Sequence, residues 1–236
     1  TIPNFDEPMD IPGYKPPREP NPAQVRAAAQ AIMESERPVL YIGGGCIHSD
    51  AHDVLIKLAE KCGIPVVSTV MGLGCFPARH PLFFDMLGMH GSVYANWAVN
   101  NADLLIAAGV RFDDRVTGKV SEFAKHGKII HIDIDASEIN KNKPVQIPIV
   151  ADARLALEAI LALVKPKEHK AWAAQIDDQK KKYPYRYDRT EKAILPQYVL
   201  EEFNSLIEGK NVVITMGVGQ HQMWCAQWLK MHLPRT

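Results

Sequence analysis

Four charged residues follow an apolar run in the middle of the sequence. The apolar run is Leu104–Ala108, which has the composition of a buried parallel strand and ends at Gly109. The charged residues are Arg111, Asp113, Asp114 and Arg115. Ligands of open α/β sheets bind beyond the carboxyl ends of the strands, where arginines and carboxylates can hold and orient an anion. A solvated loop with internal ion pairs is the alternative reading of this stretch.

Small or acidic residues also end three other predicted strands. They are the triplet Gly43–Gly44–Gly45, the pair Ser68–Thr69 and the pair Asp133–Ile134. Glycines let the backbone approach a phosphate, and an aspartate can accept hydrogen bonds from ribose hydroxyls. Together these strand ends indicate a dinucleotide or another adenine nucleotide. The nicotinamide fingerprint is not met, because position 48 is His48 where the pattern requires glycine, and many glycine triplets are plain turns.

Histidine and cysteine spacing does not predict a metal site. His48 and His52 are four residues apart, but Ser49 stands where the metalloprotease pattern has glutamate. The four cysteines are Cys46, Cys62, Cys75 and Cys225. No two of them form a CxxC pair, so we expect reduced thiols and no zinc knuckle.

Alternating apolar strands and helices position these residues. We predict strands over 38–42, 64–68, 103–108, 128–134 and 146–150, with helices over 22–36, 49–63, 92–102 and 152–164. Helix caps are expected at Asn21, Ser49–Asp50, Ser92 and Asp152, with Gly63 ending the second helix. Five strands that alternate with helices predict an α/β fold with a doubly wound parallel sheet.

The remaining residues predict linkers and an incomplete second α/β domain. Residues 1–20 are rich in proline and read as a linker, and 21–165 form the middle domain. Residues 166–195 read as a second linker that contains a charged helix over about 168–181. Residues 196–236 are predicted to start another domain, with a helix to Ile207, a strand over 211–217 and a helix from Gln220. We therefore expect a piece of a longer protein.

Charge and composition exclude some function classes. The 236 residues carry 27 Lys plus Arg and 27 Asp plus Glu, so the formal net charge is zero. Nothing in this balance points to nucleic acid or to an anionic membrane, and no apolar run reaches the ~20 residues that span a bilayer. We expect a protein of the cytoplasm, or of the plastid if the source is a plant or an alga.

Five motifs in this order resemble one enzyme family. YIGGGC, STVMGLG, LGMHG, GVRFDDRVTG and HIDID are similar to the middle domain of acetohydroxyacid synthases (acetolactate synthases), which are thiamine-diphosphate enzymes. ITMGVGQHQMWCAQW resembles the opening of that family's thiamine-binding domain. The resemblance covers essentially the whole chain.

The resemblance implies an FAD site in which the flavin serves structure more than redox chemistry. It places these residues along the cofactor: Gly43, Gly44, Gly45, Thr69, Val70, Leu87, Gly88, Met89, His90, Gly109, Val110, Arg111, Phe112, Asp113, Asp114, Arg115, Asp133, Ile134, Asp152 and Ala153. The glycine triplet would lie at the phosphate region, and the last four residues toward the adenosine end. Gln220 and His221 match the pair beside thiamine diphosphate.

The implied activity belongs to a larger assembly. The whole enzyme would decarboxylate pyruvate and join the two-carbon unit to pyruvate or 2-oxobutyrate, for branched-chain amino-acid biosynthesis. It would need FAD, thiamine diphosphate and Mg²⁺, act as a homodimer or larger, and could have a regulatory small subunit. The family's activating glutamate and magnesium motif match nothing in this chain, so we expect no catalytic residue here and no activity from this chain alone.

Two alternatives stay open. One is another carboligase or oxidase of the same superfamily, such as a glyoxylate carboligase or a pyruvate oxidase. The other is a non-catalytic, nucleotide-binding regulatory domain.

Overall fold

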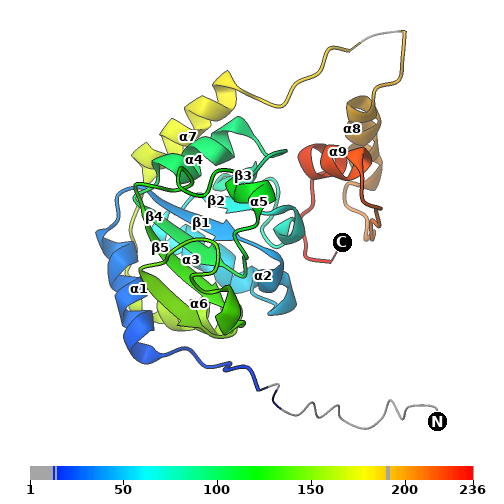
Figure 1. Cartoon of the computed structure of the whole chain (residues 1–236). Helices are drawn as coiled ribbons and strands as arrows, with labels where there is room; N and C mark the ends of the chain where they lie inside the picture. The colour runs from blue at the N-terminus through cyan, green and yellow to red at the C-terminus, as the bar shows by residue number, and fades with distance from the viewer. Residues whose placement is uncertain (1–12, 14, 190–191, 236) are drawn as a thin grey trace, which may run out of the picture.

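An open parallel sheet lies between two layers of helices in the computed structural model, which describes residues 13, 15–189 and 192–235 (Figure 1). The strand order is β3-β2-β1-β4-β5-β6, and every pair of neighbours is parallel. The strands are β1 (Pro38–Ile42), β2 (Val66–Ser68), β3 (Phe83–Met86), β4 (Leu104–Ala108), β5 (Lys128–Asp133) and β6 (Ile147–Val150). The predicted α/β class with a doubly wound parallel sheet is confirmed.

The two central strands are apolar because both of their faces are covered. Every residue of β1 and of β4 is buried, and Ile42 pairs with Ala108 at their carboxyl ends. The chain winds outward from β1 through β2 and β3 and then returns to β4 on the other side of β1. The switch point of the sheet therefore lies between Gly43 and Gly109, the residues that follow these two strands.

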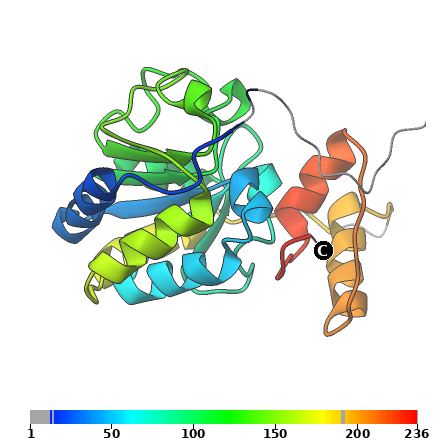
Figure 2. The same ribbon diagram turned by 90° about the horizontal axis from the view of Figure 1, so that it is seen from below.

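Helices cover both faces of the sheet. One face carries α1 (Pro22–Glu34), α2 (Gly44–His48), α3 (His52–Cys62) and α6 (Ala153–Leu163). Figure 2 shows α1, α6 and α3 side by side on that face. The opposite face carries α4 (Val93–Asn101) and α7 (Lys170–Lys182), with Tyr94, Trp172 and Ile176 in its core. Short helical turns follow the strands at the carboxyl edge, namely η1 (Val70–Gly72), α5 (Asp114–Thr117) and η2 (Ala136–Glu138).

Local sequence signals account for most helix ends. The side-chain oxygens of Asn21, Ser92 and Asp152 accept backbone N–H groups two or three residues later, at 2.8, 3.1 and 3.2 Å. Gly63 ends α3 in the left-handed conformation, with φ 59°. These predicted caps are confirmed.

The predicted cap at Ser49–Asp50 is wrong. The glycine triplet enters the short helix α2, so Ser49 lies at its C-terminal end and its hydroxyl donates to the carbonyl of Cys46 at 3.3 Å. Asp50 then takes φ 54°, and α3 begins only at His52. A side chain that could start one helix is used here to finish the previous one.

Strand β3 is absent from the sequence prediction, which gives five strands. It is a four-residue edge strand in the apolar stretch that precedes Leu87, and it pairs only with β2. So short a run has too few residues to show a period.

The charged helix predicted inside the second linker is confirmed as α7, but it packs against the sheet domain. Trp172 and Ile176 are 3% and 0% exposed, and the Trp172 indole donates to the Pro38 carbonyl at 3.0 Å. The ring nitrogens of His169 lie 2.7 Å from the carbonyl oxygen of Cys62 and 3.2 Å from that of Ser35. The segment predicted as linker 166–195 therefore begins with a helix that shares the core of the preceding domain.

The C-terminal part contributes α8 (Pro196–Ile207) and α9 (Gln220–Trp228), as predicted. Asn204 joins the two helices, because its amide donates to the Trp228 carbonyl at 2.8 Å and accepts from the Lys230 N–H at 3.0 Å. The predicted strand over 211–217 is wrong. No described strand pairs with this segment, and without a neighbour its backbone has no ladder to join.

Three other sequence predictions concern the cysteines, membrane-spanning segments and the N-terminal residues. All four cysteines are free thiols, and Cys46, Cys62 and Cys75 are buried. No helix in the described parts of the chain is long and apolar enough to cross a bilayer. The predicted linker over 1–20 lies mostly outside the described residues, although the Arg18 carbonyl accepts from the Asp152 N–H at 3.0 Å.

Candidate functional site

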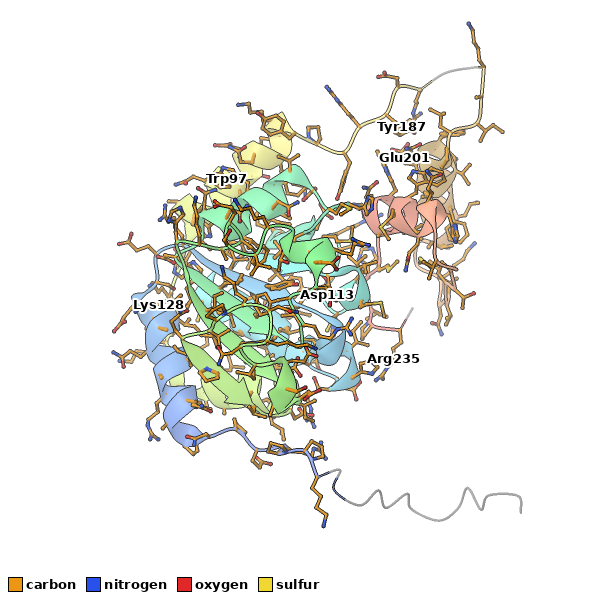
Figure 3. All side chains as sticks on the ribbon, viewed as in Figure 1. Trp97, Asp113, Lys128, Tyr187, Glu201 and Arg235 are labelled. Atoms are coloured by element: carbon orange, nitrogen blue, oxygen red, sulfur yellow. The ribbon has the colours of Figure 1, made fainter. Side chains whose placement is uncertain are left out.

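The structure gathers the predicted cofactor segments at the carboxyl edge of the sheet. The segments 43–45, 69–70, 87–90, 109–115, 133–134 and 152–153 lie at the ends of β1, β2, β3, β4, β5 and β6. Figure 3 shows this geometry through two labelled residues: Lys128 begins β5, and Asp113 stands beyond the end of β4, at the other end of the sheet. The sequence prediction that these residues meet at one edge is confirmed.

The glycine triplet packs against the backbone beyond β4. A β-carbon on Gly43 would lie 2.4 Å from the Gly109 carbonyl oxygen, and one on Gly45 would lie 2.6 Å from the Gly109 Cα. The N–H groups of Gly43 and Gly45 donate to the carbonyls of Ala108 and Gly109, both at 3.1 Å. Close backbone packing against Gly109 thus explains why positions 43 and 45 are glycine. Gly44 differs, because its nearest neighbour would be the Met71 side chain at 3.3 Å.

The turn after β3 interlocks with the turn that carries Arg115. Gly88 has φ 101°, and a β-carbon there would lie 2.8 Å from the Arg115 carbonyl oxygen. The Met89 N–H donates to the same oxygen at 2.8 Å. Asn96 of α4 accepts from the Gly88 N–H and donates to the Gly88 carbonyl, both at 3.0 Å. The two predicted cofactor segments are therefore joined to each other and to α4 by hydrogen bonds.

Alternating burial makes the charged side chains of the 109–115 turn project outward. Val110 and Phe112 are each 2% exposed, whereas Arg111 and Asp113 between and beyond them are exposed. Phe112 takes φ 51°, and its ring meets the His131 ring edge-on at 4.9 Å between centroids. The side chains of Val110, Phe112 and also Leu87 therefore belong to the core, and only their backbones face the edge.

Two ion pairs lie on this turn, and both are exposed to solvent. Arg111 and Asp113 are 3.1 Å apart, as are Arg115 and Asp114, with side chains 49 to 78% exposed. Arg115 donates to the Asp114 carboxylate, so both pairs have the form of the alternative reading, a solvated loop with internal ion pairs. Exposed adjacent pairs add little to stability, so these residues are available for an anionic ligand.

A buried polar group lies under the adenosine end of the predicted site. His131 is fully buried and its Nε2 lies 2.7 Å from the Val110 carbonyl oxygen, so Nε2 carries the proton and Nδ1 is left as an acceptor. Neither His131 Nδ1 nor the buried Glu138 Oε2 has a hydrogen-bond partner among the described residues. Both atoms are shielded from solvent, so a ligand on the surface cannot reach them, and a buried water is the kind of donor that satisfies such groups.

Burial shifts the pKa values of His131 and Asp133 at this end in opposite directions. Burial lowers the pKa of His131, against the opposing effects of the Val110 carbonyl and of the Asp133 and Glu138 charges. Burial also raises the pKa of Asp133, although the Asp135 N–H donates to its carboxylate at 2.9 Å. Both shifts arise from removal of water.

Three apolar side chains lie exposed along the same edge. They are Met71 after β2, Met89 after β3 and Ile134 after β5, exposed at 64%, 63% and 38%. The Met89 side chain is therefore not part of the hydrophobic core. Exposed apolar surface beside cationic side chains is what a ligand with planar rings and a phosphate would cover.

Helix α9 approaches this edge from the C-terminal part of the chain. Its Gln227 side chain donates to the His90 carbonyl at 2.8 Å. Gln220 and His221, at the other end of the helix, are exposed. A β-carbon on Gly219 would lie 3.2 Å from the His221 ring, so the glycine turn before α9 leaves room for the imidazole. The predicted thiamine pair thus lies at the opposite end of α9 from the residue that contacts His90.

Sequence reasoning omitted three residues of the edge, namely Met71, His131 and Glu138. Met71 and His131 stand inside the quoted motifs STVMGLG and HIDID, so their positions within these motifs were a usable signal. Glu138 stands in an ordinary polar stretch, and only the fold brings it near Asp133.

The described residues hold no group of three or more His, Cys, Asp or Glu side chains that could bind a metal ion. A cleft of about 760 Å³ lies away from the carboxyl edge, between α8 and the 230–233 segment, and Arg79, Ile207, Lys210 and Met231 are among its lining residues.

The open parallel sheet with helices on both faces is the fold expected for the middle domain of a thiamine-dependent enzyme. The sequence profile of the thiamine pyrophosphate enzyme central domain matches residues 25–160. The chain belongs to the thiamine pyrophosphate enzyme family through this central domain.

Within this family, the chain is similar to individual enzymes along nearly its whole length. The chain is 48% identical to acetolactate synthase 1, chloroplastic, of Nicotiana tabacum, over 99% of this chain and 36% of that protein. It is 46% identical to acetolactate synthase 1, chloroplastic, of Zea mays and 44% identical to acetolactate synthase, chloroplastic, of Arabidopsis thaliana, over 99% of this chain in both cases. The chain spans 36 to 38% of the length of these relatives. The resemblance to acetolactate synthases is confirmed.

Proposed function

We propose that this chain supplies the flavin-binding middle domain and the leading part of the thiamine domain of an acetolactate synthase. Identity of 44 to 48% along nearly the whole chain supports the family, and the geometry of the carboxyl edge supports the site. The whole enzyme would decarboxylate pyruvate and join the two-carbon unit to pyruvate or 2-oxobutyrate. Thiamine diphosphate, when bound, supplies the electron sink for this chemistry.

The observation that carries the flavin assignment is the set of exposed apolar side chains at the carboxyl edge. Met71, Met89 and Ile134 offer apolar contact to planar rings at the ends of three strands. Exposed Arg111 and Arg115 lie along the same edge and offer guanidinium groups to a diphosphate. An FAD molecule has both parts.

The adenosine end is proposed to lie over β5. Asp133 ends this strand, and the exposed side chain of Ile134 follows it and offers an apolar contact to adenine. The Asp133 carboxylate is the acceptor proposed for the ribose hydroxyls. Asp152 and Ala153 begin α6 at the neighbouring strand end, although the Asp152 carboxylate is already used to cap that helix.

The test of the flavin site is a titration of the 236-residue chain with FAD, followed by fluorescence quenching and by the flavin spectrum after gel filtration. We expect FAD to bind less tightly to a double variant that carries Ile134→Ser and Met89→Ser. ATP should compete with FAD only through its adenosine part. Full synthase activity in a parent enzyme that holds no flavin would contradict the assignment.

The test of the synthase activity uses the full-length enzyme with pyruvate, thiamine diphosphate and Mg²⁺. Acetolactate as the product supports the proposal. A different carboligation product, or acetyl phosphate or acetate formed with consumption of oxygen, would assign the enzyme to another branch of the superfamily. The absence of any thiamine-dependent turnover would favour a non-catalytic nucleotide-binding role.

Partners and compartment are part of the same proposal. We infer a homodimer or larger assembly, with a regulatory small subunit as a candidate partner. The relatives from Nicotiana tabacum, Zea mays and Arabidopsis thaliana are named chloroplastic, and a plastid location is proposed here only for a plant or algal source.

A further inference from the structure

Asp85 in the edge strand β3 has a conformation that the strand alone does not require. Val66 pairs with Phe83 and Ser68 pairs with Met86, so β3 contains one more residue than β2 over the same interval. The extra residue forms a bulge, and Asp85 takes φ 62° within it. Aspartate is among the side chains that tolerate this left-handed region best.

The bulge changes the face on which the Asp85 carboxylate lies. Phe83 packs in the core beneath α1, α3 and α6, and Phe84 packs in the opposite core. Regular alternation would place Asp85 on the face of Phe83. Its carboxylate instead contacts Tyr94, which belongs to the core of Phe84. The bulge thus directs a charge toward α4 and α7.

Three donors from three parts of the chain surround this carboxylate, whose side chain is 13% exposed. The Tyr94 hydroxyl of α4 donates to Oδ2, and the Lys180 ammonium of α7 lies 3.5 Å from the same oxygen. The Lys230 ammonium, in the segment that leaves α9, lies 3.9 Å from Oδ1. Asp85 is therefore shared between the sheet domain and the C-terminal part.

The two lysines are not equivalent. Lys180 also lies over the rings of Phe84 and Tyr94, at 5.9 and 5.3 Å from their centroids, so the sheet domain holds it in other ways. Asp85 is the acidic partner of Lys230 in the described chain. The Lys230 backbone is fixed to α8 through Asn204, so its side chain links α8 and α9 to β3.

The same stretch of chain leads directly to the predicted flavin edge. Four residues after Asp85, the exposed side chain of Met89 stands at that edge, and the carbonyl of His90 accepts from Gln227 of α9. Residues 85–90 therefore contact the C-terminal part at both ends, through Lys230 and through Gln227. A shift of α9 would be transmitted to the turn that holds Met89.

We propose that Asp85 is a positioning residue that fixes α9, and with it the pair Gln220 and His221, relative to the flavin edge. This inference rests on the proposed synthase function for its kinetic consequence. Asp85 is not among the residues predicted to bind either cofactor, and it acts through Lys230 and the 85–90 stretch. Its charge is required because an amide keeps the Tyr94 hydrogen bond but loses the attraction to Lys230.

The kinetic test uses the full-length enzyme and a double-mutant cycle between Asp85→Asn and Lys230→Met. We expect each single variant to lower kcat about 3- to 10-fold, with the pyruvate KM within about twofold and normal flavin content. The double variant should turn over no more slowly than the slower of the two single variants. Lys230→Arg keeps the positive charge and should retain the wild-type kcat. The exposed pair Asp177 and Lys181, 2.7 Å apart on α7, supplies the matched control cycle, for which we expect no change.

A second measurement is independent of catalysis. Hydrogen exchange of the 220–230 peptides in the 236-residue chain should accelerate in Asp85→Asn and stay unchanged in Asp177→Asn. An inactive wild-type enzyme would count against the synthase proposal and leave this measurement to decide the role of Asp85. Unchanged exchange in Asp85→Asn, or additive kinetic losses in the cycle, would overturn the inference.

Discussion

The carbonyl oxygen of Gly109 lies where a side chain on Gly43 would have to be, 2.4 Å from the position of its β-carbon. The two residues follow the central strands at the switch point of the sheet, and the contact is between backbones. The glycine that sequence patterns associate with phosphate binding is thus required by the fold itself. Phosphate approach and backbone packing make different predictions for the three glycines of the triplet.

Gly43→Ala should destabilise the chain, because neither the Gly109 carbonyl nor the Val110 side chain can move without disturbing β4. Overpacking of this kind costs about 1–3 kcal/mol of unfolding free energy. Urea unfolding of the variant checks this. Gly44→Ala is the matched control, since its β-carbon would meet only the side chain and carbonyl of exposed Met71, at 3.3 and 3.6 Å. We expect Gly44→Ala to keep stability and to weaken FAD binding, and the reverse pattern would contradict both assignments.

Met89→Ala separates a binding role from a packing role. The side chain is 63% exposed, so we expect a loss of less than about 0.5 kcal/mol of stability, as is usual for surface changes. The affinity for FAD should fall, because an adaptable apolar contact is lost. Calorimetry gives the melting temperature, and flavin titration gives the affinity. A large drop in melting temperature with unaltered flavin affinity would show that Met89 serves the fold.

Arg115→Lys tests the charged turn. The side chain is 74% exposed and pairs with Asp114 on the same turn, so stability should not change. Lysine keeps the charge but loses the planar fork that binds a phosphate or carboxylate with two hydrogen bonds. We expect weaker binding of FAD, or a higher KM for pyruvate in the full-length enzyme. Lys57→Arg on the exposed face of α3 is the control. Equal FAD affinity and equal KM for pyruvate in the wild type, Arg115→Lys and Lys57→Arg would show that the turn binds no ligand.

The pH dependence of stability should reveal His131. Burial lowers its pKa in the folded chain, whereas the unfolded chain takes up the proton near the ordinary value of about 6.5. Between these two pKa values the unfolded state binds more protons, so the free energy of unfolding falls as the pH drops through this window. His131→Gln keeps a donor for the Val110 carbonyl and does not titrate. Its unfolding free energy should depend less on pH below about 6.5 than that of the wild type.

The difference between the two proteins isolates His131 from other groups. The pKa of His232 is also lowered by burial, and its contribution cancels because both proteins contain it. Asp133 has a raised pKa and acts in a lower, acidic window with the opposite sign. Parallel pH profiles for wild type and His131→Gln would mean that His131 does not titrate differently on unfolding.

Local sequence signals predicted helices and strands correctly where a residue type has one common structural role. The apolar run of β4, the cap at Ser92 and the left-handed Gly63 were all readable in this way. The prediction failed where tertiary contacts decide. Ser49 could start a helix but ends one, and the 211–217 segment has strand composition but no described neighbour to pair with. Propensity is a weak prior once packing competes with it.

Some features of the candidate site were predictable from the sequence, and others were not. The convergence of the segments at one edge follows from parallel strands, so the sequence was sufficient to predict it. Sequence could not show that Gly43 and Gly45 pack on Gly109, that Leu87 and Phe112 are core side chains, or that Glu138 comes near Asp133. Those facts depend on distances in the folded chain, whether the residues are far apart in sequence, as Gly43 and Gly109 are, or near each other, as Asp133 and Glu138 are.

The two ends of α9 should affect different cofactors. Gln220 and His221 are exposed at its N-terminal end, where the glycine turn leaves the backbone open. Gln227, near its other end, donates to the His90 carbonyl within the predicted flavin segment. In the full-length enzyme, Gln220→Ala and His221→Ala are expected to lower thiamine diphosphate affinity or turnover and to leave flavin content intact.

Gln227→Ala should do the opposite. It removes a hydrogen bond worth about 0.5–1.5 kcal/mol, so flavin should dissociate severalfold faster while thiamine diphosphate affinity changes little. Cofactor titrations of the three variants, with the exposed Gln30→Ala of α1 as the control, measure both quantities. The 236-residue chain alone should form no acetolactate with thiamine diphosphate and Mg²⁺ in excess, because it spans little more than a third of its relatives. Activity from this chain would show that the catalytic groups are misplaced, and flavin loss in Gln220→Ala would show that the two cofactor regions are not separated by α9.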